Sequence, residues 1–217
     1  MKATVFMPVF LDVAKAFDRV DHGLLLHKLQ MIGIDDAALQ WFQSYLYGCS
    51  ICTVVDGEKS CLLPISSGVP QGSVLGPLLF ILYFGDLPGY VSSTSCLYAD
   101  DTLVYDRDCH AARGSASSGS IQCCLLPSDL KCLDSWSSTW NTKFNAGKSA
   151  HMVFSSARLP SDTIAPSQWT LNQDPVPLVN EVKHLGLMLT STLQWSAHIH
   201  ALLLRVGYRI YLLKRLA

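Results

Sequence analysis

Charged residues are scarce in this sequence, and the few that it has nearly cancel. Asp, Glu, Lys and Arg make up 15% of the 217 residues, against about a quarter in an average protein, and the formal net charge is -1. This balance argues against a generally basic nucleic-acid-binding protein. Hydrophobic residues make up 49% of the chain, which excludes wholesale disorder, and the length allows one compact domain or a domain with a small appendage.

A secretory start and a long hydrophobic run are also missing. The N-terminal residues lead at once to Pro8 and Asp12, which do not fit a signal peptide. The longest apolar run, residues 74–84, contains Gly76 and Pro77 and is shorter than the roughly 20 residues that cross a bilayer. We therefore expect an intracellular chain, nuclear or cytoplasmic, with no membrane partner and with its eight cysteines reduced.

A second Cys-x-x-Cys pair is missing as well. Cys49 and Cys52 form the only such pair, and zinc sites of this class need four ligands. We prefer the interpretation that these cysteines are small residues at the start of a strand.

The sequence does contain helical and strand-like patterns that do not alternate strictly, which predicts an α+β fold. Strands are expected at residues 9–11, 96–105 (two strands meeting at Asp100 and Asp101), 151–154, 169–171 and 184–189, with a hairpin over 52–65. Helices are expected at residues 21–33, 35–48, 74–86, 121–140 and 198–216, Asp21 capping the first and Pro127 interrupting the start of the fourth. Residues 66–73 predict a loop, and residues 107–120 a linker prone to disorder.

Three carboxylates stand beside apolar strands, where a charge is costly unless it has a partner. Asp12 ends the first strand, and Asp100 and Asp101 lie between two others. If the strand ends meet, the carboxylates repel one another, and a divalent metal such as Mg²⁺ relieves this. Because side chains alternate along a strand, we favour Asp100 as the second principal ligand and place Asp101 at the turn in a secondary role. The alternative is that Asp100 and Asp101 are turn residues only.

The loop over residues 66–73 precedes a helix. Its glycines allow a backbone to approach a ligand closely, and a helix N-terminus favours phosphate. Gln71 could bind a base edge or a sugar. The alternative is an ordinary loop in which Ser73 caps the helix.

Taken in order, these segments resemble the palm of a reverse transcriptase from a non-LTR (LINE-type) retrotransposon. The first three motifs are long and specific. They are residues 10–22 (FLDVAKAFDRVDH), 67–77 (SGVPQGSVLGP) and 98–101 (YADD). Weaker similarity continues through residues 145–148 (NAGK), 184–186 (HLG) and 193–199 (LQWSAHI), so that the match covers about residues 5–215.

The resemblance implies a right-hand polymerase palm, a small antiparallel sheet with helices packed on one face. Asp12, Asp100 and Asp101 would be the catalytic metal ligands, holding two Mg²⁺ ions, with Mn²⁺ as a substitute. The ions would activate a primer 3′-hydroxyl and stabilise the departing pyrophosphate. An RNA template, a DNA primer and dNTPs would be the partners; the oligomeric state is not predicted.

The resemblance also implies nucleotide-binding residues. Phe17 falls at the position where an aromatic ring excludes a 2′-hydroxyl, although core packing explains it too. Gln71 and Gly72 would meet the incoming nucleotide or the template. Lys148 would assist the pyrophosphate leaving group, or be a solvated loop lysine.

The sequence departs from the family's pattern in the fourth motif and near residue 86. Ala146 stands where family members usually carry proline, Ser149 and Ala150 stand in place of Thr-Glu, and Gly85 stands in place of asparagine. None of these changes removes a predicted metal ligand.

We expect the fingers to be largely missing and the thumb truncated. The predicted layout is a palm over residues 1–190, with a partial fingers insertion at about 23–65, and the start of a thumb or connection helix over 191–217. Arg205 and Arg209 share a face of that helix and would contact phosphate weakly, or only solvent.

Two functions follow from this comparison. The first is RNA-directed DNA polymerisation, by this chain or within a longer product; without fingers the isolated chain is expected to be inactive. The second is a catalytically inactive remnant of a retrotransposon. A domesticated nucleic-acid-binding module has little support from the charge balance.

Overall fold

The computed structural model describes residues 5–106, 110–111, 121–122, 125–155 and 169–216. The helices are α1 (His22–Met31), α2 (Asp36–Leu46), α3 (Leu75–Phe84), α4 (Leu126–Thr139) and α5 (Ser196–Leu216), with short 3-10 turns η1 (Ala16–Arg19) and η2 (Leu87–Tyr90). The strands are β1 (Val5–Leu11), β2 (Ser50–Ile51), β3 (Val54–Val55), β4 (Glu58–Lys59), β5 (Leu63–Pro64), β6 (Thr94–Tyr98), β7 (Asp101–Asp106), β8 (His110–Ala111), β9 (Ile121–Gln122), β10 (Ala150–His151), β11 (Phe154–Ser155), β12 (Thr170–Leu171), β13 (Asp174–Pro175), β14 (Glu181–His184) and β15 (Leu187–Thr190).

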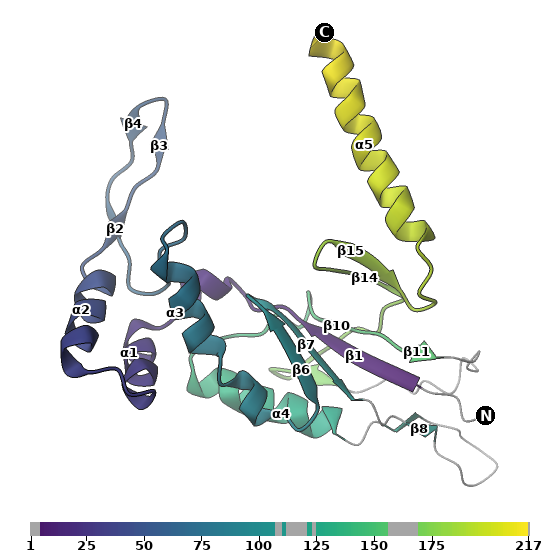
Figure 1. The fold of residues 1–217 in the computed structure, drawn as a ribbon, viewed down its shortest axis with the longest axis horizontal. Helices are drawn as coiled ribbons and strands as arrows, with labels where there is room; N and C mark the ends of the chain where they lie inside the picture. Colours follow the sequence, from purple (N-terminus) through teal and green to yellow (C-terminus); the bar gives the residue numbers. More distant parts are fainter. Residues whose placement is uncertain (1–4, 107–109, 112–120, 123–124, 156–168, 217) are drawn as a thin grey trace.

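An antiparallel sheet lies at the centre of the molecule (Figure 1). Its strands follow the order β10-β1-β7-β6, and β11 also pairs with β1. In the central pair Val9 of β1 lies opposite Val104 of β7, and β6 and β7 are joined by a tight turn. The predicted α+β class is confirmed.

The two faces of this sheet are covered differently. Alternate β1 side chains, including Val9, belong to the same buried cluster as Leu79 of α3 and Leu130 of α4. On the other face, the Phe10 ring lies 5.1 Å from the ring of His184 in the β14-β15 hairpin. Val9 therefore shares a buried cluster with α3 and α4, while Phe10, on the opposite face of β1, meets the β14-β15 hairpin.

Local sequence signals explain how the first two helices begin. The Asp21 carboxylate accepts a hydrogen bond from the Leu24 N–H at 3.0 Å, and Asp35 accepts one from Ala38 at 2.9 Å. Each bond satisfies an N–H group that lacks a partner within the helix. Gly33 follows α1 with a φ of 89°, a conformation that glycine adopts without strain.

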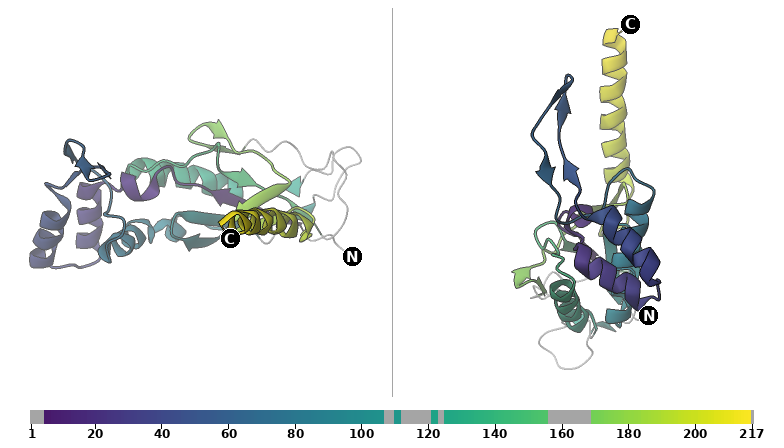
Figure 2. Two further views of the ribbon diagram at one scale, coloured as in Figure 1. Left: turned by 90° about the horizontal axis from the view of Figure 1, so that it is seen from above. Right: turned by 90° about the vertical axis from the view of Figure 1, so that its left-hand side faces the viewer.

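Two segments project from the same side of the body, the β2–β5 hairpin and α5 (Figures 1 and 2). The hairpin turns at Asp56 and Gly57, whose φ angles of 51° and 86° suit a two-residue turn, as the sequence predicted. Helix α5 contains no buried residue.

Several predicted boundaries were wrong. Helix α4 begins only at Leu126, and Pro127 lies in its first turn, where the missing N–H costs nothing. The segment predicted as a strand over 184–189 is a hairpin, since Leu185 and Gly186 adopt positive φ angles of 46° and 82° between β14 and β15. The strand predicted over 151–154 is divided between β10 and β11.

Two further expectations concern the linker and membrane-spanning helices. The linker predicted over 107–120 lies outside the described residues except for His110–Ala111. Among the helices that the structure describes, none is both long and apolar enough to cross a membrane.

Candidate functional site

Asp12 follows β1 directly and is anchored by its own backbone. Its N–H donates to the Ser149 Oγ at 3.1 Å, and its carbonyl accepts from the Asn145 N–H at 2.8 Å. The burial of β1 on both faces thus delivers one carboxylate at the end of a central strand, in a fixed position.

Asp100 and Asp101 lie at the turn between β6 and β7. Tyr98 pairs with Asp101, so that Ala99 and Asp100 form the turn and Asp101 is the first residue of β7. This corrects the expectation that Asp101 occupies the turn. Since Leu11 pairs with Thr102, Asp12 and Asp101 are each one residue beyond the last pair of the β1-β7 ladder.

The charges of Asp100, Asp101 and Lys148 act on the Asp12 carboxyl. Burial raises the pKa of the Asp12 carboxyl, the charges of Asp100 and Asp101 raise it further, and the Lys148 ammonium lowers it. The Asp12 Oδ2 atom is buried and has no hydrogen-bond partner among the residues that the structure describes. A buried carboxylate oxygen without a donor, within electrostatic reach of two further carboxylates, supplies the oxygen ligands that a hard cation such as Mg²⁺ prefers.

The carboxylates are nevertheless not gathered into a compact cluster. Within the described part of the chain, no group of three or more His, Cys, Asp or Glu side chains is arranged closely enough to hold a metal ion. The three carboxylates therefore influence one another without forming a ready-made metal site.

The loop over residues 66–73 is fastened to the segment that follows Asp12. The Gly68 N–H donates to the Val20 carbonyl at 2.7 Å, and the Val69 N–H donates to the Phe17 carbonyl at 2.9 Å. Gly68 has a φ of 93°, and a Cβ there would lie 2.9 Å from the Asp18 backbone. Only glycine allows this close approach.

The predicted ligand residues of this loop are exposed. The Gln71 Nε2 donates to the Asp18 Oδ1 at 3.0 Å, and Gly72 has a φ of 86° with open space around it. The Ser73 Oγ accepts a hydrogen bond from the Gly76 N–H at 2.9 Å, but the N-cap of α3 is Val74, one residue after Ser73.

Phe17 lies between the core and an apolar cavity. Its ring stacks on Phe80 at 4.3 Å, which supports the core-packing interpretation. It also lines a cavity of about 610 Å³ with Tyr98 and Ala99, next to the turn that carries Asp100. Phe17 therefore borders the carboxylate-bearing turn.

Comparison with known proteins decides the family. Residues 2–189 match the family described as reverse transcriptase (RNA-dependent DNA polymerase). This chain belongs to the reverse transcriptase family.

Its relatives are proteins of mobile elements. The chain is 33% identical over 198 residues to the RNA-directed DNA polymerase from mobile element jockey of Drosophila melanogaster, covering 88% of this chain and 20% of that protein. It is 31% identical to the probable RNA-directed DNA polymerase from transposon BS of the same fly (95% and 22%), and 26% identical to the type-1 retrotransposable element R2 polyprotein of Popillia japonica (99% and 37%). The resemblance to non-LTR retrotransposon reverse transcriptases is confirmed, and the chain spans about a fifth of the length of the jockey and BS relatives.

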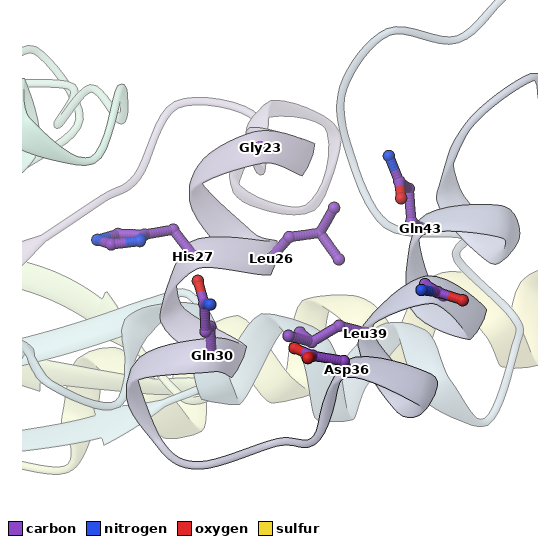
Figure 3. A pocket seen from close by; sticks show the side chains of 8 residues that line it. Gly23, Leu26, His27, Gln30, Asp36, Leu39 and Gln43 are labelled. Carbon is purple, nitrogen blue, oxygen red and sulfur yellow. The ribbon is translucent and has the colours of Figure 1, made fainter.

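Two predicted residues of this reverse transcriptase domain lie apart from the carboxylates. Arg205 and Arg209 are exposed on α5, which extends away from the sheet (Figure 1). A groove of about 420 Å³ between α1 and α2, lined by His27, Gln30 and Gln43, is also separate and contains no predicted site residue (Figure 3).

Two polar residues of the site were missed. Asp18 holds Gln71, and Ser149 holds Asp12. Ser149 was noted only as a departure from the family's pattern, and no local pattern could reveal its contact with a residue 137 positions away. Asp18 had a weak signal, since it lies inside the first motif.

Proposed function

We propose that this chain is the palm region of a non-LTR retrotransposon reverse transcriptase and takes part in template-directed nucleotidyl transfer. The observation that carries the proposal is the buried Asp12 Oδ2 without a donor, in a carboxylate whose pKa is raised by burial and by Asp100 and Asp101. A charged group in such surroundings is costly to the fold, and such costs concentrate at functional sites.

Asp12, Asp100 and Asp101 would hold two divalent ions, Mg²⁺ or Mn²⁺. When bound, such a pair stabilises charge on the attacking and departing oxygens of an in-line phosphoryl displacement. The chain's own contribution is to fix the Asp12 backbone through Asn145 and Ser149.

The remaining residues have proposed roles around this centre. Lys148, whose charge reaches Asp12, would offset negative charge on the leaving pyrophosphate. Gln71, held by Asp18, and Gly72, with open space around it, would meet the nucleotide or the template. Phe17 would limit the space at the sugar, and Arg205 and Arg209 would contact nucleic-acid phosphates.

The domain layout belongs to the same proposal. The palm would comprise residues 1–190, the projecting β2–β5 hairpin would lie in a fingers insertion at about 23–65, and α5 would begin the thumb. RNA template, DNA primer and dNTPs are the proposed partners. An intracellular location is proposed from the sequence alone.

One observation favours a second candidate, an inactive retrotransposon remnant. Among the described residues the carboxylates are not close enough to form a three-ligand metal site. On that alternative the chain keeps the family's fold without the chemistry.

Primer extension separates the two candidates. If the palm is competent without the fingers that are expected to be missing, the purified chain should extend a DNA primer on an RNA template with Mg²⁺ or Mn²⁺, and Asp12→Ala should abolish extension. Asp174→Ala, at an exposed position of β13, is the matched control and should extend as the wild type does. A wild-type chain that folds and binds Mn²⁺ but extends no primer would contradict polymerisation by the isolated chain, and a chain that folds without binding Mn²⁺ would favour the remnant.

A further inference from the structure

The segment carrying Lys148 runs antiparallel to the segment carrying Asp12, and the two have different numbers of residues between their pairing contacts. Phe10 pairs with Ala150, and Val13 bridges to Phe144. Between these contacts one side has two residues, 11–12, and the other has five, 145–149. The longer side forms a turn, so the regular ladder is interrupted beside Asp12.

The Ser149 side chain closes this interruption. Its hydroxyl oxygen accepts from the Asp12 N–H at 3.1 Å and donates its own proton to the Asn145 carbonyl at 2.8 Å. The Asn145 N–H in turn donates to the Asp12 carbonyl at 2.8 Å, which completes a closed ring of hydrogen bonds. Ser149 is 1% exposed, so water does not compete for these bonds.

The same ring fixes Lys148 in relation to Asp12. Lys148 lies inside the turn, with its N–H directed to the Asn145 carbonyl at 3.1 Å, and it is the direct neighbour of Ser149. The charge of Lys148 acts on Asp12 in the folded chain. A shift of the turn would therefore move an ammonium group relative to the carboxylate.

We propose that Ser149 is a positioning residue of the reverse transcriptase site, whose hydroxyl holds the Asp12 backbone and the Lys148 turn in register. This inference rests on the proposed function. The hydroxyl makes no contact with substrate; it acts by fixing the position of a predicted metal ligand and of a predicted leaving-group lysine, where displacements of about 1 Å are costly.

The chain offers a matched set of variants. Ser149→Ala removes the hydroxyl but keeps the backbone bond from the Ser149 N–H to the Asn145 carbonyl at 2.8 Å, so the turn itself should persist. Ser149→Thr keeps the hydroxyl and should restore the wild-type behaviour. Ser138→Ala removes an exposed serine hydroxyl of α4 that bonds the Asp134 carbonyl of its own helix, and serves as the control.

Amide hydrogen exchange, followed by NMR on the full chain, tests the contact directly. In the wild type and in Ser138→Ala the Asp12 amide should be protected. In Ser149→Ala it should exchange roughly tenfold faster, the effect of losing one hydrogen bond. An Asp12 amide that exchanges freely in the wild type, or equally slowly in Ser149→Ala, overturns the proposal without reference to any activity.

Mn²⁺ binding and primer extension test the consequence. Ser149→Ala should weaken Mn²⁺ binding about tenfold and, where the wild type extends a primer, lower kcat by about tenfold with a smaller change in the KM for dNTP. Faster Asp12 exchange with unchanged Mn²⁺ affinity and kcat would make Ser149 a packing residue and overturn the positioning role. A wild type that neither binds Mn²⁺ nor extends a primer overturns both the proposed function and this positioning role, while the exchange result then reports only the contact.

Discussion

Replacing Lys28 with methionine is expected to destabilise the fold, because this lysine is buried among three aromatic rings. Its ammonium lies 2.6 Å from the Asp86 Oδ1 and donates to the Tyr83 carbonyl. It also lies 3.8 Å from the ring centroid of Trp140 and 5.1 Å from that of Trp136. These contacts connect α1 to the α3–η2 region and to α4.

The size of the effect follows from the burial of the two partners. Removing one partner of a fully buried ion pair costs about 3–5 kcal/mol, because the other charge is left without compensation. The Lys28 side chain is 6% exposed but that of Asp86 is 37% exposed, so water can reach the remaining carboxylate. Methionine also preserves the volume of the lysine stem, and it carries no charge, so it avoids the cost of burying the ammonium that lowers the pKa of Lys28. We therefore expect a loss of about 2–3 kcal/mol in the free energy of unfolding.

Urea unfolding followed by circular dichroism measures this loss. Lys28→Met, Asp86→Asn and the double variant form a cycle, in which we expect a coupling of about 1–2 kcal/mol. Asparagine retains the Oδ1 that accepts from the Trp136 Nε1–H at 3.1 Å. Lys131→Met, at an exposed position of α4, is the control and should change the stability by less than about 0.5 kcal/mol. A Lys28→Met variant as stable as this control, or a coupling near zero, would refute the reasoning.

Three further predictions concern the site and its supports. Asp12→Asn should abolish primer extension and stabilise the chain at neutral pH. The pKa of Asp12 is raised above 3.8 in the folded state, so between pH 3.8 and that raised pKa the folded chain holds a proton that the unfolded chain has lost. The stability of the wild type therefore falls as the pH rises through this window. In urea titrations the stability advantage of asparagine should vanish below the window. Gly68→Ala should lower the free energy of unfolding by about 3 kcal/mol, because a positive φ and a clash with the Asp18 backbone both contribute. Gly57→Ala, which has a positive φ but open space, should lower it by about 1 kcal/mol. Equal losses of stability in thermal unfolding would contradict this. Burial lowers the pKa of His151 below 6.5, so the unfolded state binds a proton before the folded state does, and the stability of the wild type should drop as the pH falls through 6.5. His151→Gln should show a flatter dependence of stability on pH between about pH 7.5 and 5.5. Parallel pH profiles for the two proteins would refute this prediction.

Much of the secondary structure was predictable because its causes are local. Asp21 and Asp35 cap helices by bonding N–H groups three residues away, and Asp56-Gly57 specifies a turn through its own φ angles. One of the errors has a clear physical cause. In the segment 184–189 an apolar run concealed a turn, because Leu185 adopts a positive φ that its residue type does not announce.

The elements that carry the candidate site residues were predictable, and their arrangement less so. The strand before Asp12 and the turn holding Asp100 could be read from apolar runs ending in carboxylates. Which of Asp100 and Asp101 begins the strand could not, because both are aspartates, a residue type that turns favour, and only the pairing of Asp101 with Tyr98 distinguishes them. The metal-ligand roles of these residues remain predictions.

The sequence by itself determined the family, the order of helices and strands, and the carboxylates at the strand ends, because motifs and periodicity are local properties of the chain. Only the tertiary structure decided that Ser149 holds Asp12 across 137 residues and that Lys28 finds Asp86 across 58. The physical reason is common to both. A buried hydroxyl or ammonium must find a partner wherever packing brings one, and packing depends on the whole fold rather than on neighbouring residues.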